Sequence, residues 1–277
     1  MIKTILSATD FSDAATNAYS YATYLAKAFK AKVMLFNAYQ PLPVPVSHPV
    51  TIVTPADMQK DVRRKLRLVA RSVEAYDIHT EILCEQGNTI REILKAATDH
   101  HADVIITGMK KQHKGIGKLF GSTVTALIRK TRIPLIIIPE KADLTPIRTI
   151  ALVIDRDIDQ DDDVNVFSIL RELVHGFHAT LYLVRTTGYQ LPGSYDPLQL
   201  PGEIKRMMKD LHPLYDTIEG KDPAEGLNNF VMTNHIDMLA LLTDQHSMLG
   251  TLFVKSLSRS MAFETHVPLL ILPGLKS

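Results

Sequence analysis

The second part of this sequence repeats motifs of the first part in the same order, and this repeat constrains the fold more than any other feature. Lys3–Asp10 reads KTILSATD and Arg148–Asp155 reads RTIALVID, and both are short apolar runs that end in aspartate. At a constant offset of 134 positions, four further identities fall in register: Ser122 with Ser256, Thr131 with Thr265, Pro134 with Pro268, and Pro139 with Pro273. Matches in register indicate that one unit has been duplicated. The 277 residues suit two domains, which we place at residues 1–143 and 144–277.

Each unit alternates apolar strands with amphipathic helices, which predicts an α/β fold. The strands expected in the first unit are Ile2–Ala8, Lys32–Ala38, Ile78–Glu85, Val104–Gly108 and Pro134–Ile138, and the helices are Ser12–Lys30, Ala56–Tyr76, Thr89–His100 and Ser122–Lys130. The strands expected in the second unit are Thr149–Ile154, Thr180–Arg185, Leu214–Glu219, Met238–Thr243 and Pro268–Leu272, and the helices are Gln160–Phe177, Glu203–Leu211, Pro223–Asn234 and Lys255–Thr265. Strands that are apolar on both faces belong in parallel sheets covered by helices. We therefore expect two open, doubly wound, parallel five-stranded sheets with helices on both faces.

The last strand of each unit is very apolar, and a bare edge of this kind promotes aggregation. Pairing the two final strands with each other hides both edges. The sequence therefore predicts an intramolecular pseudo-dimer joined through these strands, with further association into homo-oligomers left open.

Composition restricts the classes of partner. The formal net charge is +1, so no global field attracts nucleic acid or an anionic membrane. The single cysteine, Cys84, forms no internal disulfide, and no apolar run approaches the roughly 18 residues of a membrane span. The N-terminus has no basic stretch followed by a sustained apolar one. We expect a cytoplasmic protein with neither a membrane nor a specific nucleic acid as its partner.

Ligands of open parallel sheets bind beyond the carboxyl ends of the strands, where the strand order reverses. The segment Thr107–Lys130 begins at such an end, contains several glycines and lysines, and finishes where Gly121, Ser122 and Thr123 open a helix. Backbone amides at a helix N-terminus and at glycines favour anions. Four lysines of the segment add positive charge, namely Lys110, Lys111, Lys114 and Lys118. This segment is the candidate phosphate site of the first unit.

At this point the chain resembles the universal stress proteins, as two copies of their domain in one chain. Members that bind ATP carry a glycine, two residues, a second glycine, nine residues, and then Gly-Ser or Gly-Thr. Gly108 and Gly121-Ser122 match this spacing, and the opening TDFSDAA is typical of the family. The resemblance implies that Asp10 contacts the nucleoside, that the backbone at Ala38 lines the base pocket, and that Mg²⁺ accompanies the nucleotide.

Lys111 stands where the family has its second glycine. Two outcomes are open at this position. A lysine there costs conformational energy and places a Cβ near the anion, or its ammonium binds phosphate as a point charge.

The second unit has no glycine at the equivalent positions, which are Leu242, Gln245 and Lys255-Ser256. Asp155 matches Asp10, but an aspartate there more often caps a helix. We therefore expect nucleotide binding in the first unit only, with the second unit as a degenerate partner.

Three functions remain. The first is a regulatory stress-response module that binds ATP or a related nucleotide, the second is a nucleotide-independent interaction scaffold, and the third is a weak nucleotide hydrolase or adenylyl-transfer enzyme. The enzyme ranks last because no base, nucleophile or metal cluster accompanies Gly108–Ser122. Neither His100-His101 nor the acidic run Asp159–Asp163 has the spacing of metal ligands, and the basic run Val62–Arg71 is typical of an amphipathic surface helix.

Overall fold

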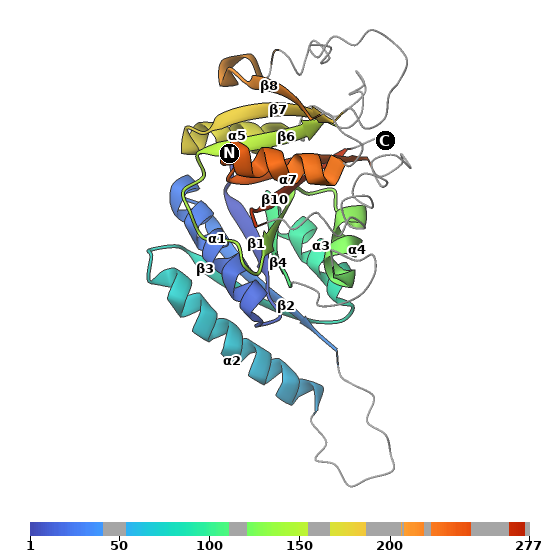
Figure 1. Ribbon diagram of the computed structural model, residues 1–277. Helices are drawn as coiled ribbons and strands as arrows, with labels where there is room; N and C mark the ends of the chain where they lie inside the picture. The colour runs from blue at the N-terminus through green and yellow to red at the C-terminus, as the bar shows by residue number, and fades with distance from the viewer. Residues whose placement is uncertain are drawn as a thin grey trace.

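A single ten-stranded sheet, in the order β3-β2-β1-β4-β5-β10-β9-β6-β7-β8, forms the centre of the molecule (Figure 1). The computed structural model describes residues 1–40, 54–110, 121–154, 167–186, 206, 208–218, 223–244 and 266–274. The two predicted five-stranded sheets are the two halves of this sheet, and each half is parallel within itself. The predicted fold class is confirmed, with one continuous sheet in place of two separate ones.

The described residues of the first half form five strands and four helices. The strands are β1 (Thr4–Ala8), β2 (Lys32–Tyr39), β3 (Thr80–Gln86), β4 (Val104–Met109) and β5 (Leu135–Pro139), and the helices are α1 (Asp13–Phe29), α2 (Pro55–Glu74), α3 (Thr89–Asp99) and α4 (Ser122–Lys130). Side chains at the N-caps set three of the helix starts. Ser12 caps α1, Asn88 caps α3, and Thr54 forms a capping box with Asp57 at the start of α2.

The second half repeats the same strand order. Its strands are β6 (Thr149–Ile154), β7 (Thr180–Thr186), β8 (Leu214–Ile218), β9 (Met238–Asp244) and β10 (Leu269–Gly274), and its described helices are α5 (Ser168–Phe177), the 3₁₀ turn η2 (Lys209–Leu211) and α7 (Pro223–Thr233). The described part of the predicted helix Glu203–Leu211 thus ends in a 3₁₀ turn. The predicted helix Lys255–Thr265 and the first residues of the predicted helix Gln160–Phe177 lie outside the described residues.

The duplication is visible in hydrogen bonds as well as in strand order. Asp103 Oδ2 accepts the N–H groups of Lys3 at 2.7 Å and Thr4 at 2.8 Å. Asp237 Oδ2, 134 positions later, accepts the N–H groups of Arg148 at 2.8 Å and Thr149 at 2.9 Å. Both aspartates thus tie the start of β4 or β9 to the start of the neighbouring strand β1 or β6.

The two halves meet at β5 and β10, which pair antiparallel with Ile137 opposite Leu269 and Leu135 opposite Ile271. All five described residues of β5 and all six of β10 are buried. The antiparallel pair supplies the hydrogen-bonding partners that each strand would otherwise lack at an exposed edge.

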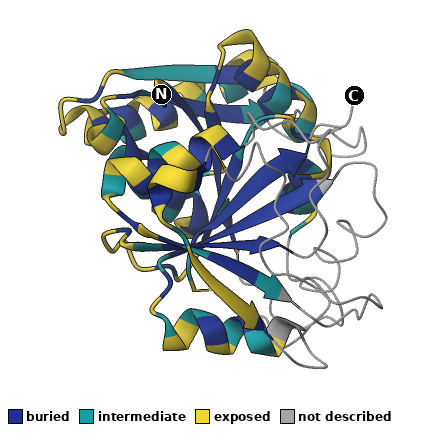
Figure 2. Ribbon diagram, turned by 90° about the horizontal axis from the view of Figure 1, so that it is seen from above, coloured by how far each residue is buried: buried dark blue, intermediate teal, exposed yellow. Residues whose placement is uncertain are grey.

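Helices cover both faces of the sheet, and most strand residues between them are buried (Figure 2). On one face α1, α2 and α5 pack in one core, and on the other face α3, α4 and α7 pack in a second core. Successive strand residues alternate between the cores, as Ile5 and Leu6 of β1 do. Small residues let α1 approach the sheet closely, because Ala14, Ala18 and Ala22 lie on its buried face.

The helix α1 also holds the connection between the halves. Asn17 Nδ2 donates to the carbonyl oxygens of Pro139 at 3.0 Å and Ala142 at 2.8 Å, and the Tyr21 hydroxyl donates to the Asp143 carbonyl. Further along α1, the ring of Tyr24 stacks on Phe177 of α5 at a centroid distance of 5.2 Å. A single helix of the first half therefore contacts the linker and the second half.

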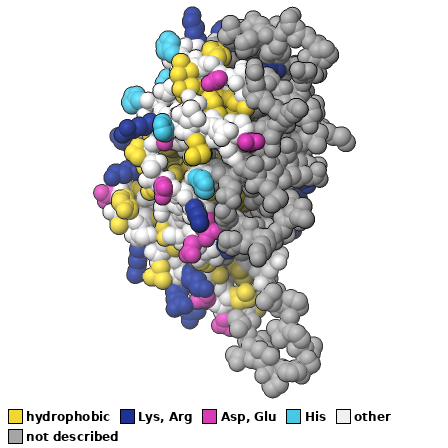
Figure 3. All heavy atoms as spheres, viewed as in Figure 1, with side chains coloured by type: hydrophobic (Ala, Val, Ile, Leu, Met, Phe, Trp, Pro, Cys, Tyr) yellow, Lys and Arg dark blue, Asp and Glu magenta, His cyan; other side chains and the backbone are white. Residues whose placement is uncertain are grey.

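The basic run Val62–Arg71 lies on α2 at the molecular surface. Leu66, Ala70 and Val73 are buried against the sheet, and the arginines and lysines of the helix face solvent. Figure 3 shows Lys and Arg side chains on the lower part of this face, where α2 runs in Figure 1. The predicted amphipathic surface helix is confirmed.

Within the described part of the chain, no helix is long and apolar enough to cross a bilayer.

Candidate functional site

The strand order reverses at β1 and β4, which are neighbours in the sheet although β2 and β3 intervene in the chain. Crevices at the carboxyl ends of parallel strands form at such a reversal. A cavity of about 350 Å³ lies there, between the ends of β1, β2 and β4 and the starts of α1, α3 and α4. The topology therefore determines the place of the site, and the loop residues determine its chemistry.

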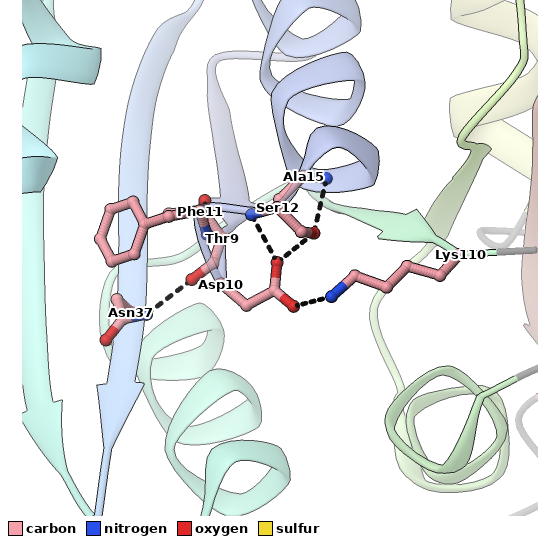
Figure 4. A network of polar contacts seen from close by, with 7 residues as sticks. All are labelled: Thr9, Asp10, Phe11, Ser12, Ala15, Asn37 and Lys110. Atoms are coloured by element: carbon pink, nitrogen blue, oxygen red, sulfur yellow. Dashed lines mark hydrogen bonds and ion pairs between the residues drawn. The ribbon is translucent and has the colours of Figure 1, made fainter.

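The turn between β1 and α1 forms one wall of the cavity (Figure 4). Asp10 Oδ1 accepts the Ser12 N–H at 3.0 Å and also the Ser12 hydroxyl. Thr9 Oγ1 accepts the N–H of Phe11 at 3.0 Å, and Phe11 has a left-handed backbone with φ of 62°. These hydrogen bonds hold a bulky residue in a conformation that is otherwise rare, and they fix the direction of the Asp10 carboxylate.

Lys110, the residue after β4, reaches across the cavity to Asp10. Its Nζ lies 3.0 Å from Asp10 Oδ2, and both side chains are more than half exposed. Burial disfavours the charged form of Asp10, but the hydrogen bonds from Ser12 and Lys110 outweigh it, so the pKa of this carboxyl is lowered. Asp10 is thus an anionic acceptor with a cation beside it.

The end of β2 forms a second wall. Asn37 is buried and its Nδ2 donates to the Thr9 carbonyl at 2.7 Å, while the Thr9 N–H donates to the Phe36 carbonyl at 2.8 Å. Ala38 follows and also lines the cavity. The three consecutive residues Phe36, Asn37 and Ala38 all line this side of the cavity.

Gly108 lines the cavity, but its closest neighbour is α1. A Cβ added at Gly108 would lie 2.2 Å from the Ala14 carbonyl oxygen and 2.7 Å from the Ala15 nitrogen. Real Cβ atoms do not approach backbone so closely, so only glycine lets the first turn of α1 lie on the end of β4. The observed reason for this glycine is helix packing, whatever ligand the cavity takes.

The start of α4 also lines the cavity. Gly121 is the N-cap, with φ of −58° and no side chain to accept a hydrogen bond from the helix. Ser122 and Thr123 occupy the first turn and line the cavity. A helix start without a side-chain cap presents backbone N–H donors and a partial positive charge to whatever lies in front of it.

Six of the seven predicted site residues line this one cavity: Asp10, Ala38, Gly108, Gly121, Ser122 and Thr123. The seventh, Lys111, lies outside the described residues, so its two alternatives stay predictions. The structure adds residues that the sequence did not single out, among them Thr9, Asn37 and Thr89. A signal for Asn37 existed, since it is a polar residue at the end of an otherwise apolar strand. The sequence does not distinguish Lys110 from the other three lysines of its segment.

The equivalent region of the second half is described only in part. Leu242, which corresponds to Gly108, is buried in β9. Asp155, Gln245 and Lys255-Ser256 lie outside the described residues. Within the described ranges, no group of three or more His, Cys, Asp and Glu side chains is arranged to hold a metal ion.

Comparison with known proteins agrees with this architecture. The model of the universal stress protein family matches residues 1–139. A curated relative, a universal stress protein of Thermus aquaticus described by its position in the QAH/OAS sulfhydrylase 3' region, is 29% identical over 140 residues, which is 50% of this chain and 99% of the relative.

Several solved structures resemble the fold of the whole chain. A universal stress protein from Archaeoglobus fulgidus has a TM-score of 0.73 at 15% identity and covers 99% of both chains. A universal stress protein described as putative, from Pseudomonas aeruginosa, has a TM-score of 0.56 at 13% identity, covering 99% of this chain and 94% of its own. From the family match over half of its length, this chain belongs to the universal stress protein family.

Proposed function

We propose that the first half binds a nucleotide, with ATP as the expected ligand, and that the chain acts as a regulatory module whose state depends on this binding. The observation that carries the proposal is the gathering of Asp10, Ala38 and the start of α4 around one cavity. Its volume of about 350 Å³ lies within the range of about 300–1,000 Å³ typical of small-molecule sites.

The two sides of the cavity suit the two ends of a nucleotide. We assign the phosphates to the start of α4, where the amides of Ser122 and Thr123 and the Lys110 ammonium are the donors. We assign the nucleoside to the other wall, where Asp10 accepts from sugar hydroxyls and the Ala38 backbone faces the base. In this assignment the phosphates of the nucleotide supply most of the ligands of Mg²⁺. The protein cannot supply them, because Asp10 is the one carboxylate among the described lining residues.

The test is equilibrium binding of labelled ATP with and without Mg²⁺, on the wild type and on Gly121→Asp with Ser122→Ala. Aspartate is a good N-cap and the φ of −58° at Gly121 suits any residue, so the helix should still form. Its carboxylate would occupy the position assigned to phosphate and repel it. We expect affinity to fall at least 100-fold, which corresponds to the loss of two or more charge-assisted hydrogen bonds.

The matched control is Ser72→Asp, which adds the same charge at an exposed position of α2 remote from the cavity lining. It should bind ATP as the wild type does. If the wild type binds no nucleotide, or if the double variant binds it unchanged, the proposal is wrong. In the first case the interaction scaffold becomes the better account of this chain.

The remaining expectations concern the cellular setting. We propose a cytoplasmic location on the basis of the single cysteine, and a role without nucleic acid on the basis of the net charge of +1.

The third function is tested by ATP turnover. Turnover by the wild type that is abolished in the Gly121→Asp variant would favour the hydrolase or adenylyl-transfer function over the regulatory module.

A further inference from the structure

The ion pair between Asp10 and Lys110 spans the cavity that the proposed nucleotide would enter (Figure 4). Asp10 follows β1 and Lys110 follows β4, so the pair joins the ends of two neighbouring strands. Asp10 lies on the side assigned to the nucleoside, and Lys110 can also serve the phosphates. A nucleotide therefore meets two groups that already satisfy each other.

The hydrogen bonds of Asp10 show what the pair prevents. Oδ1 accepts the N–H and the hydroxyl of Ser12, and Oδ2 accepts the Lys110 ammonium at 3.0 Å. A carboxylate offers about four acceptor positions, so three are already used. The position held by Lys110 is on Oδ2, the oxygen that Ser12 does not use. A sugar hydroxyl that binds Asp10 therefore binds Oδ2, beside the ammonium or in its place.

The pair itself is weak enough to exchange. The Lys110 side chain is 58% exposed and the Asp10 side chain is 63% exposed. Ion pairs at such exposure contribute little to stability because water and salt screen them. A multiply charged phosphate is a stronger partner for the ammonium than one carboxylate. The lysine side chain is flexible and its ammonium group can donate hydrogen bonds in several directions. Lys110 can therefore turn to a new anion without needing one particular orientation.

Resting on the proposed nucleotide site, we infer that Lys110 acts as its selectivity residue by exchanging partners. Phosphate draws the Lys110 ammonium from Asp10, and a sugar hydroxyl takes the released position on Oδ2. A ligand with both groups replaces both halves of the ion pair, whereas a nucleoside without phosphate leaves Lys110 in place and must share Oδ2 with its ammonium. The site therefore selects phosphorylated nucleosides over nucleosides.

The test is calorimetric titration of ATP and of adenosine into the wild type, Lys110→Gln and Lys110→Arg. In Lys110→Gln we expect ATP affinity to fall about 10-fold or more, because one charge-assisted hydrogen bond is lost. Adenosine affinity should stay unchanged or rise by up to about 3-fold, since Asp10 is released from a weak pair. Lys110→Arg keeps the cation and should keep ATP affinity within about 3-fold. Lys60→Gln, an exposed lysine of α2, controls for the loss of one positive charge.

The outcomes separate this inference from the proposed function. If Lys110→Gln lowers the affinities for ATP and adenosine by the same factor, Lys110 only positions Asp10 and the exchange is wrong. If Lys110→Gln leaves ATP affinity unchanged, Lys110 contacts no phosphate and the exchange is again wrong. If the wild type binds neither ATP nor adenosine, the proposed function itself fails, and the exchange fails with it.

Discussion

Replacing Gly108 by alanine tests the packing of α1 on β4. The added Cβ would lie 2.2 Å from the Ala14 carbonyl oxygen and 2.4 Å from the Ala14 carbonyl carbon, so the helix must move. Overpacking of this kind destabilises by about 1–3 kcal/mol. The clash is with backbone rather than with a side chain that can rotate, so we expect a loss of about 3 kcal/mol, or about 100-fold in the folding equilibrium.

The assay is unfolding in urea, followed by far-UV circular dichroism. With an m-value of about 2–3 kcal/mol per molar, a loss of this size lowers the midpoint by about 1 M. The matched control is Gly176→Ala in α5, where the new Cβ meets the Phe29 ring at 2.4 Å. That ring can turn away, and alanine gains about 1 kcal/mol over glycine within a helix, so the midpoint should fall by less than half as much. An unchanged midpoint for Gly108→Ala, or a larger loss for Gly176→Ala, would refute the packing argument.

Three other outcomes are expected. Asp103→Ala and Asp237→Ala each remove two hydrogen bonds to backbone N–H groups, so each should lower the free energy of unfolding by about 1–3 kcal/mol; a large effect at one site and none at the other would contradict their equivalence. Burial, followed by the charges of Asp143 and Asp237, raises the pKa of Tyr21 to about 12. Its neutral form therefore stabilises the fold fully below about pH 10, and this contribution is lost as pH rises through about 12. An ultraviolet titration of the nine tyrosines should show a phenol that ionises near pH 12 and that is missing in Tyr21→Phe; complete ionisation near pH 10 in the folded protein contradicts this. A protease site placed within Glu140–Pro146 should yield two fragments that elute together, since β5 and β10 pair and α1 contacts α5; separate monomeric halves would exclude that association.

The strand and helix pattern was predictable because it depends on local periodicity. The helix Ser122–Lys130 and the strand Thr149–Ile154 have the bounds expected from sequence. The strand β1 begins at Thr4, two residues later than the expected Ile2, and the Lys3 N–H just before it binds the Asp103 side chain instead of a neighbouring strand. That contact joins residues about 100 positions apart, and no local pattern signals it.

The site was predictable in its place and less so in its contacts. Spacing brought Gly108 and Gly121 into one candidate site, and both line the cavity. Spacing did not indicate that α1 makes a glycine necessary at position 108, since this depends on how deeply the helix sits. The sequence also does not predict the pairing of Lys110 with Asp10, because nothing in it distinguishes the four lysines of the segment. In the structure Lys110 directly follows the end of β4, which lies beside the end of β1, and this brings it to Asp10.

Leucine at position 242 carries a consequence for how the two halves have diverged. No helix backbone can lie as near to the end of β9 as Ala14 lies to β4, because a buried branched side chain fills that space. The end of β9 therefore leaves less room for a helix than the end of β4, although the strand order is the same. A search for binding sites that requires glycine would reject the second half because Leu242 replaces Gly108. At Gly108, however, the glycine is required by the closeness of α1 to β4, and the leucine therefore says nothing about a phosphate contact.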